Sequence, residues 1–332
     1  MNGWGLLASI SISFFASFLF AWFLYWLDLY EKEPFLLLGG VFLWGAVVSA
    51  GAAFIANTLS GLGVYVLTGS EAASNLTIGT LIAPFFEEIF KGFAVFLIFI
   101  IFRKEFDSIL DGIVYAGVAA LGFAATENAF YIYTYGFLED GWEGFRSLSL
   151  IRIGLVGWQH PFYTAFFGIG LALARNNRSF LIKIGAPAIG LFAAITTHGL
   201  HNLLASLFPG VGGMAFTSIL DWLGWLAMLG FIVIIMFLEK QHLKTFLKPE
   251  VQLGTLTDQQ FMQAISIFKI QTNRFLALFT GKYAKTTQFY RSAAELALKK
   301  RQLDRLGDEK GNRQTVNSLR AKVRDLSHAL QA

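Results

Sequence analysis

The sequence predicts an all-α, polytopic membrane protein with about seven transmembrane helices and a small helical cytoplasmic tail. Apolar residues make up 55% of the 332 residues and only 14% are charged, whereas a soluble domain carries roughly 25% charged residues. Several apolar stretches reach the about 20 residues that cross the hydrocarbon core of a bilayer. The charge is also uneven: residues 1–238 hold nine Lys/Arg against fourteen Asp/Glu, and residues 239–332 hold seventeen against eight.

These patterns predict a transmembrane domain over residues 1–240 and a basic helical cytoplasmic tail over residues 241–332. The first apolar stretch lacks a basic start and exceeds the apolar core of a cleaved signal, so we expect a membrane helix there. Cysteine is absent, which excludes a disulfide framework and cysteine-based metal sites or nucleophiles. The expected spans are residues 4–27, 35–57, 76–102, 109–135, 152–174, 181–206 and 214–238.

Basic residues in the connections predict the orientation, because cytoplasmic loops are enriched in Lys and Arg. One set of connections carries nearly all of them, and the other set carries only Arg146 and Arg152. We therefore expect a multi-pass protein of the plasma or inner membrane, with the N-terminus outside and the C-terminus in the cytoplasm. An even helix count, through a missed or re-entrant segment, is the alternative. The basic set is Lys32, Arg103, Lys104, Arg175, Arg178, Lys183, Lys240 and Lys244.

The tail is expected to form three helices. Thr257 and Gln260 have capping-box spacing, and Gly281 and Gly307 are typical of helix ends. A coiled-coil-like 3-4-3-4 spacing in the last helix favours packing against the preceding helix, with self-association or partner docking as alternatives. The positive charge could also hold the tail against anionic lipid. The seam is formed by Val316, Leu319, Val323, Leu326 and Leu330.

Three ionisable residues, Glu87, Glu88 and Lys91, stand in the middle of the third apolar stretch. An ionised side chain at the bilayer centre costs about 2.5–3.5 kcal/mol on the translocon scale. Two adjacent carboxylates also repel each other, so one needs a proton or a cation. Lys91 follows Glu87 by four residues and Glu88 by three, so all three can share one helix face.

Three further spans carry polar residues at a similar expected depth, roughly 12–17 Å below their outer ends at 1.5 Å per residue. A common depth predicts one shared site. The four residues expected at this depth are Glu87, Glu127, His160 and His198. The other polar residues of these spans are Asn128, His201 and Asn202.

Two kinds of chemistry fit this set of residues. His160, His198 and Glu127 could hold a divalent metal such as zinc. Alternatively, a carboxylate could activate water directly while a histidine or asparagine stabilises the oxyanion; no cofactor is favoured. Each residue also has a structural interpretation, as an ion pair, an interhelical hydrogen bond or a partner for the carbonyl group freed by Pro161. The tail lacks signatures of nucleic-acid binding.

With these residues in place, the chain resembles the PrsW family of intramembrane proteases, within the group that includes the CAAX-processing enzymes. The resemblance covers roughly residues 20–240. It rests on four blocks in order and on DLYEKEP in the first loop. His201 departs from the family, which commonly has an aromatic residue there. The motifs are DLYEKEP at 28–34, EEIFK at 87–91, DGIVYAGVAALGFAATEN at 111–128, His160 with Thr164, and His198 with Asn202.

The resemblance implies an endopeptidase that cleaves a membrane-tethered protein, such as an anti-sigma factor, near its extracytoplasmic side. In the preferred mechanism Glu87 or Glu88 activates water, and His198 with Asn202 stabilises the oxyanion. Glu127 and His160 orient or protonate the leaving group, and Lys91 sets the charge of the carboxylate pair. The rival hypotheses are a metal-dependent form of this protease, a proton-coupled transporter and a non-catalytic scaffold.

Overall fold

The computed structural model describes residues 3–30, 32–308 and 311–331, and within these ranges the chain is helical without strands. The predicted all-α class is confirmed. The chain forms two compact units. We call residues 1–27, 33–175 and 180–230 the membrane unit, and residues 28–32, 176–179 and 231–332 the tail unit. Glu31 of the first-loop motif lies outside the described residues.

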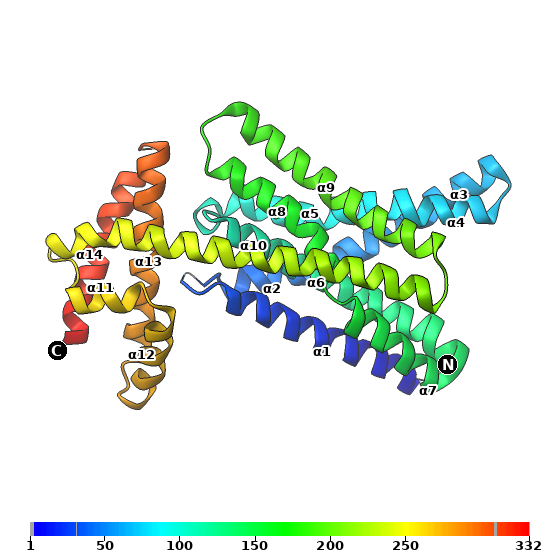
Figure 1. Ribbon diagram of the computed structural model, residues 1–332, viewed down its shortest axis with the longest axis horizontal. Coiled ribbons are helices and arrows are strands. Elements are labelled where there is room, and N and C mark those ends of the chain that lie inside the picture. Colours follow the sequence, from blue (N-terminus) through cyan, green and yellow to red (C-terminus); the bar gives the residue numbers. More distant parts are fainter. Residues whose placement is uncertain (1–2, 31, 309–310, 332) are drawn as a thin grey trace. The chain divides into compact units, whose positions relative to one another are not determined.

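The membrane unit consists of helical segments, some of which follow one another without a break (Figure 1). The first half contains α1 (Gly3–Leu27), α2 (Phe35–Leu43), η1 (Trp44–Ser49), α3 (Ala50–Thr68), α4 (Glu71–Thr77), η2 (Ile78–Ile82), α5 (Ala83–Ile101) and η3 (Arg103–Glu105). The second half contains α6 (Ile109–Tyr131), η4 (Ile132–Phe137), α7 (Leu138–Ser149), η5 (Leu150–Leu155), α8 (Gln159–Arg175), α9 (Phe180–Leu207) and the start of α10 (Val211–Gln252).

Five helical segments of the described chain are long and apolar enough to cross a membrane: Gly3–Leu27, Phe35–Thr68, Ile109–Arg175, Phe180–Leu207 and Val211–Gln252. The expected count of seven is therefore not confirmed. Two of the expected spans fall within the single segment Ile109–Arg175. A further expected span falls on α4, η2 and α5, where three charged residues interrupt the apolar pattern.

α6 forms the centre of the membrane unit. Most of its residues are buried, and it packs against α1, α2, η1 and α8. At the crossing with α8 the two backbones approach so closely that a Cβ atom on Gly112 would lie 2.3 Å from the carbonyl oxygen of Gly168. Small residues allow such close crossings inside membranes. This crossing brings the polar residues of α6 and α8 to the same core.

The expected span 152–174 is interrupted in the structure. Helix η5 ends at Leu155, and α8 begins only at Gln159. Pro161 helps to explain the break, since proline has no N–H to donate to the carbonyl oxygen of Gly157. Before this, the chain turns back at Asp140 and at Gly141, whose φ is +60°, so α7 packs against η4. The turn and the break together return Arg152 and His160 to the level of Glu127.

The tail unit contains the end of α10 and four further helices, rather than the three expected. They are α11 (Asp258–Ala264), α12 (Ile267–Phe279), α13 (Tyr283–Leu306) and α14 (Asn312–Gln331). The capping box of Thr257 and Gln260 is confirmed, with both reciprocal hydrogen bonds formed. The additional helix arises because the backbone leaves the helical conformation at Ile265 and Ser266. Gly281 and Gly307 follow helix ends with positive φ.

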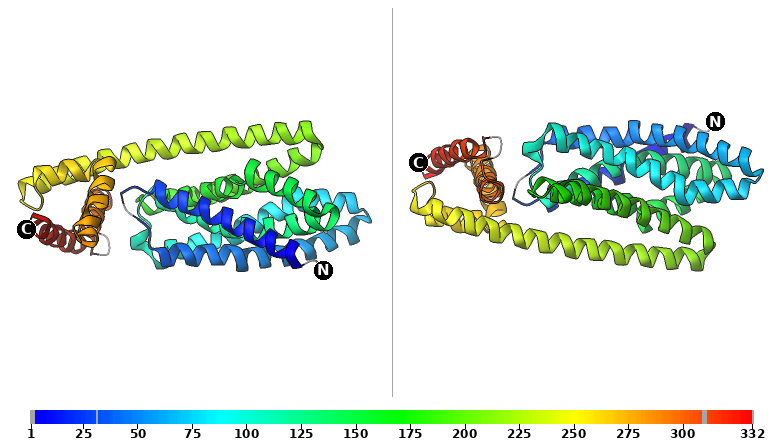
Figure 2. Two further views of the ribbon diagram at one scale, coloured as in Figure 1. Left: turned by 90° about the horizontal axis from the view of Figure 1, so that it is seen from below. Right: turned by 90° about the horizontal axis from the view of Figure 1, so that it is seen from above.

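The predicted seam of α14 lies in the tail-unit core. Val316, Leu319 and Val323 are buried, and Leu326 and Leu330 are packed against the same cluster. In Figure 2, α13 and α14 lie side by side, in orange and red. This agrees with the favoured intramolecular packing, while self-association stays a prediction. The expected domain boundary at residue 240 falls inside the continuous helix α10 and also stays a prediction.

Candidate active site

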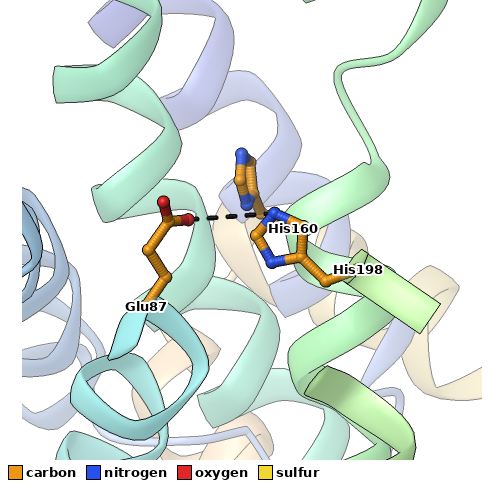
Figure 3. A group of neighbouring side chains, drawn as sticks. All are labelled: Glu87, His160 and His198. Carbon is orange, nitrogen blue, oxygen red and sulfur yellow. Dashed lines mark ion pairs between the residues drawn. The ribbon is translucent and has the colours of Figure 1, made fainter. Parts of the chain in front are cut away.

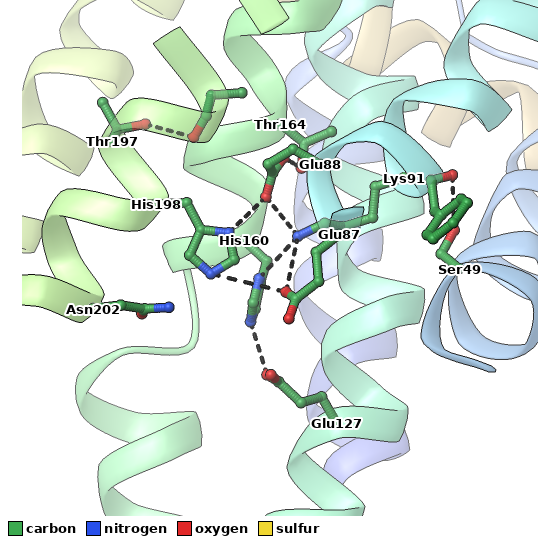
Figure 4. Close-up of polar contacts among 12 residues, drawn as sticks. Ser49, Glu87, Glu88, Lys91, Glu127, His160, Thr164, Thr197, His198 and Asn202 are labelled. Atoms are coloured by element: carbon green, nitrogen blue, oxygen red, sulfur yellow. Dashed lines mark hydrogen bonds and ion pairs between the residues drawn. The ribbon is translucent and has the colours of Figure 1, made fainter. Parts of the chain in front are cut away.

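The polar residues expected to share one depth meet in the membrane unit (Figure 4). Glu87, Glu88 and Lys91 come from α5, and Glu127 comes from the last turns of α6. His160 lies in the first turn of α8, and His198 and Asn202 lie on α9. Four helices thus contribute to one cluster of side chains.

Glu88 is held by three donors and is completely buried. Its carboxylate lies 2.6 Å from the Lys91 ammonium group, 2.8 Å from the Thr164 hydroxyl and 3.0 Å from Nδ1 of His198. Charge-assisted hydrogen bonds of this kind are strong and directional. These hydrogen bonds fix the position of the Glu88 carboxylate, and the carboxylate in turn orients the side chains of Lys91, Thr164 and His198.

Glu87 is buried but much less constrained. Its Oε2 atom accepts no hydrogen bond from any described residue, although the Lys91 ammonium group and Nε2 of His198 each lie 3.8 Å away. Figure 3 shows this carboxylate pointing toward the two imidazole rings. A buried acceptor without a hydrogen-bond partner loses the free energy of its hydration. This oxygen is therefore suited to accept a hydrogen bond from water, to take a proton or to bind a cation.

The hydrogen-bond partners assign the neutral tautomers of both histidines. Nδ1 of His160 lies 3.2 Å from the Lys91 ammonium group, which can only donate. Its Nε2–H therefore donates to Glu127 across 3.0 Å. Nδ1–H of His198 donates to Glu88, which leaves the Nε2 lone pair of His198 directed toward Glu87. Two acceptors consequently face each other at the centre of the cluster.

Arg152 contacts the cluster, although from the sequence we counted it only among the basic residues of the connections between spans. Its guanidinium group pairs with Glu127 across 2.5 Å and donates to Asn128 across 2.7 Å. It also lies over the ring of Tyr131, 4.1 Å from the centroid. One sequence feature could have indicated that Arg152 belongs to the site: it stands at the outer start of an apolar stretch, on the same expected side of the membrane as Glu127.

A second polar group adjoins the first. His201 pairs with Asp221 of α10 across 3.0 Å, and the Gln159 side chain donates to Asp221 across 2.8 Å. The Tyr163 ring stacks on His198 with centroids 4.9 Å apart, and its centroid lies 6.4 Å from that of His201. Asp221 was missed, although it is the one charged residue in the expected span 214–238.

The cluster lines a cavity of about 900 Å³ in the membrane unit. This volume lies at the upper end of the range for ligand pockets. Both acidic and basic groups reach it, together with aromatic side chains from α6 and its extension. The residues that line it include Glu87, Glu127, Arg152, His160, His198 and Asn202.

Comparison with known proteins decides the family. The model of the family described as "PrsW family intramembrane metalloprotease" matches residues 33–238. The chain belongs to this family. The resemblance expected from the sequence is thereby confirmed, and membership supports the expected enzyme class, a peptidase.

Two curated PrsW proteins are similar to the chain. "Protease PrsW" of Geobacillus kaustophilus is 34% identical over 153 residues, which are 46% of this chain and 60% of that protein. "Protease PrsW" of Oceanobacillus iheyensis is 27% identical over 176 residues, or 53% of this chain and 73% of that protein. The first match thus spans three fifths of the relative's length. No solved structure matches the chain significantly.

The family description implies a metal, and the residues present fit one. Among the described residues, Glu87, His160 and His198 each offer one ligand atom, and these atoms lie within 4.8 Å of one another. Two histidines and one glutamate form a known ligand set of catalytic zinc. The bond from His198 to Glu88 also matches the carboxylate partner that orients a ligating histidine.

The expected ligand set differs from this cluster in one residue. Glu127 was the expected carboxylate, whereas the carboxylate beside both imidazoles is Glu87 and Glu127 pairs with Arg152. Asn202 lines the cavity, and its amide donates to the carbonyl oxygen of Gly79 across 2.8 Å. The expected roles of these positions stay predictions.

Proposed function

We propose that the protein is a membrane-embedded endopeptidase that hydrolyses a membrane-tethered protein near its extracytoplasmic side. One observation carries the proposal. Glu87 Oε2 and His198 Nε2 face each other across 3.8 Å at the wall of a large cavity. Two acceptors at this separation can share one water molecule that donates an O–H to each. Family membership supplies the reaction class.

In the proposed reaction, Glu87 takes a proton from this water while the oxygen attacks the scissile carbonyl carbon. The C–N bond then breaks, and Glu87 returns the proton to the departing amine, so that the products are a carboxyl group and an amine. A positioned carboxylate of this kind contributes roughly 10²–10⁴-fold to rate. Glu88 keeps His198 in the tautomer whose Nε2 faces the water.

The oxyanion that forms in this reaction needs donors at the cavity wall. The Asn202 amide has a second N–H besides the one donated to Gly79, and the Arg152 guanidinium group also lines the cavity. We assign oxyanion stabilisation to these two residues. This assignment replaces His198 by Arg152 relative to the expected mechanism, because the Nε2 atom of neutral His198 cannot donate.

Metal dependence is the second form of the proposal, favoured by the family description and by the donor set. A divalent ion held by Glu87, His160 and His198 would supply an activated water and polarise the scissile carbonyl group. His160 would release its contact with Lys91 or with Glu127 to bind it. Glu127 would then be the carboxylate remaining at the cavity to accept the proton.

The substrate class and the orientation rest on the resemblance and on the loop charges. We propose a single-span, membrane-tethered protein such as an anti-sigma factor as substrate, with the N-terminus of the protease outside and its C-terminus in the cytoplasm. The orientation can be measured on the cysteine-free chain by labelling single cysteines from each side of the membrane. Labelling of the 241–332 region from outside would contradict it.

The test of function uses purified wild-type protein and Glu87→Gln in proteoliposomes with candidate single-span proteins. Wild type should cleave the substrate, and the variant should lose at least about 10²-fold in single-turnover rate. Equal cleavage by both proteins would contradict the role of Glu87. Chelator separates the two mechanisms, because only the metal-dependent form requires an ion.

A further inference from the structure

One helix of the tail unit exposes a strongly apolar face. α12 buries Ile270 and Ala277 against the rest of the unit, whereas Phe268, Phe275 and Phe279 are 80%, 59% and 76% exposed. At 3.6 residues per turn these three phenylalanines fall within about 40° of one another, opposite Ala277. The exposed rings therefore share one side of the helix, with Gln271 and Thr272 between Phe268 and the pair Phe275 and Phe279.

Two leucines widen this apolar surface. Leu276 and Leu278 flank it on either side, and more than half of each side chain is exposed. We call Phe268, Phe275, Leu276, Leu278 and Phe279 the α12 outer face. Phe275, Leu276, Leu278 and Phe279 form its contiguous part, and exposed apolar surface of this kind marks an interaction site in a folded protein. The face lies beyond residue 238, where the match to the family model ends.

The surroundings of this face are positively charged. Between Asp258 and Glu295 the sequence contains no acidic residue, while it contains Lys269, Arg274, Lys282, Lys285 and Arg291. Of these, Lys269 and Lys285 are exposed, whereas Arg274 is buried. Lys269 lies on the Leu276 side of α12 by helix geometry, and Lys285 lies in the first turn of α13. A helix with aromatic and aliphatic residues on one face and lysines beside it is typical of segments that lie in the interface of a membrane.

From this combination we infer that the α12 outer face inserts into the interface of an anionic lipid leaflet. The chain is already embedded in a membrane, and α10 continues without a break from the membrane unit into the tail unit. The lipid surface is therefore present at high effective concentration. Basic residues near an anionic leaflet add electrostatic attraction to the insertion of the apolar side chains.

A second copy of the chain is the less favoured occupant. Pairing two α12 outer faces would bring two acid-free, basic stretches together without opposite charge within either stretch. Juxtaposed like charges disfavour such an interface. Anionic lipid supplies both the apolar layer for the phenylalanines and the negative charge for the lysines. The inference does not depend on protease activity.

The test uses the full chain, which has no native cysteine. Leu276→Cys places an environment-sensitive fluorophore on the α12 outer face and keeps all three phenylalanines. Ser318→Cys places the same fluorophore on an exposed position of α14 as control. Both proteins are reconstituted into vesicles of phosphatidylcholine alone or mixed with equal phosphatidylglycerol, and quenching by brominated lipid is compared with quenching by aqueous iodide.

In the phosphatidylglycerol vesicles we expect brominated lipid to quench the probe at 276 at least about twofold more than the probe at 318. The difference should shrink in phosphatidylcholine alone and at high salt, because charge attraction is screened. Replacing Lys269, Lys282 and Lys285 together by Gln should weaken it similarly, and Phe268→Ser with Phe279→Ser should abolish it.

Two results would overturn the inference. Equal exposure of both probes to iodide in the anionic vesicles would show that lipid does not cover this face. Efficient disulfide formation between Leu276→Cys chains, with shielding that persists in detergent, would show that a second copy covers it. Because α12 lies on the surface, hydrogen exchange of α13 and α14 verifies that each variant keeps the tail-unit core.

Discussion

Two buried carboxylates, Glu87 in the membrane unit and Glu250 in the tail unit, differ in the number of hydrogen bonds that they accept. Glu250 accepts two hydrogen bonds from Arg320, at 2.8 and 2.9 Å, and one each from Lys300 at 2.6 Å and Thr255 at 2.9 Å. Glu87 Oε2 accepts no hydrogen bond from the described part of the chain. A saturated carboxylate stabilises a fold, whereas an unsaturated one at a cavity can take part in chemistry.

Removing the carboxylate charge at each place should separate the two roles most clearly. Glu87→Gln should lower the single-turnover cleavage rate by at least about 10²-fold without loss of folded protein. Glu250→Gln should cleave normally per folded molecule, because its bonds end within the tail unit. Rates are measured on a reconstituted single-span substrate. Comparable losses of rate per folded molecule in both variants would contradict a specific catalytic role of Glu87.

Metal removal is expected to have the next largest effect. If Glu87, His160 and His198 bind an ion, chelation should reduce cleavage by about 10²-fold or more, and zinc should restore it. Elemental analysis should find about one ion per chain in wild type and less in His198→Ala. Full activity in protein free of bound metal would instead establish water activation by the glutamate alone.

Breaking the saturated cluster should reduce stability rather than activity. Glu250→Ala leaves Lys300 and Arg320 without their shared carboxylate, and we expect a loss of about 3 kcal/mol in tail-unit stability. Hydrogen exchange of α13 and α14 measures it. The exposed pair of Asp308 and Arg313 is the matched control, where Arg313→Ala keeps the backbone hydrogen bond to Asp308 and should cost less than about 1 kcal/mol. Equal losses would argue against a special role for burial.

A smaller effect is expected at the ion pair that constrains Glu127. Arg152→Gln removes the contact with Glu127 and part of the proposed oxyanion donation, so kcat should fall roughly 10-fold or more while KM changes little. Arg152→Lys should recover part of the rate, because lysine keeps the charge but not the fork geometry. A change confined to KM would assign Arg152 to substrate binding.

The smallest effect is expected at His201, which we interpret as a positioning residue. His201→Phe keeps an aromatic ring near Tyr163 but loses the contact with Asp221. We expect less than about a 5-fold change in kcat and a similar change for Asp221→Asn, with no additional loss in the double variant. An effect as large as that of Glu87→Gln would place His201 among the reacting groups.

How much the sequence could reveal differs between residues. Equal depth along four apolar stretches was enough to predict that Glu87, Glu127, His160 and His198 belong together. Asp140-Gly141 is a common turn dipeptide and Pro161 weakens the helix before it, but neither pattern indicates that the turn and the break bring Arg152 to Glu127. The partner of Asp221 was equally hidden, since pairing across α9 and α10 depends on helix rotation rather than on spacing.

The tail shows the same limit. The capping box at Thr257 and the seam of α14 were readable because each is a short-range pattern. No such pattern marked the break at Ser266. Without knowledge of this break, α12 could not be recognised as a separate helix with its own exposed face. Local capping chemistry is encoded within a few residues, whereas the face that a helix leaves uncovered is decided by distant contacts.

The pairing of Lys91 with Glu88 has a consequence for biosynthesis. α5 leaves the ribosome before α8 and α9, so Thr164, His160 and His198 do not yet exist when this segment must enter the bilayer. The three-residue spacing to Glu88 lets the lysine neutralise a charge within its own helix, at 2.6 Å in the finished protein. The nascent segment can therefore insert with one net negative charge, before Thr164, His160 and His198 are synthesised.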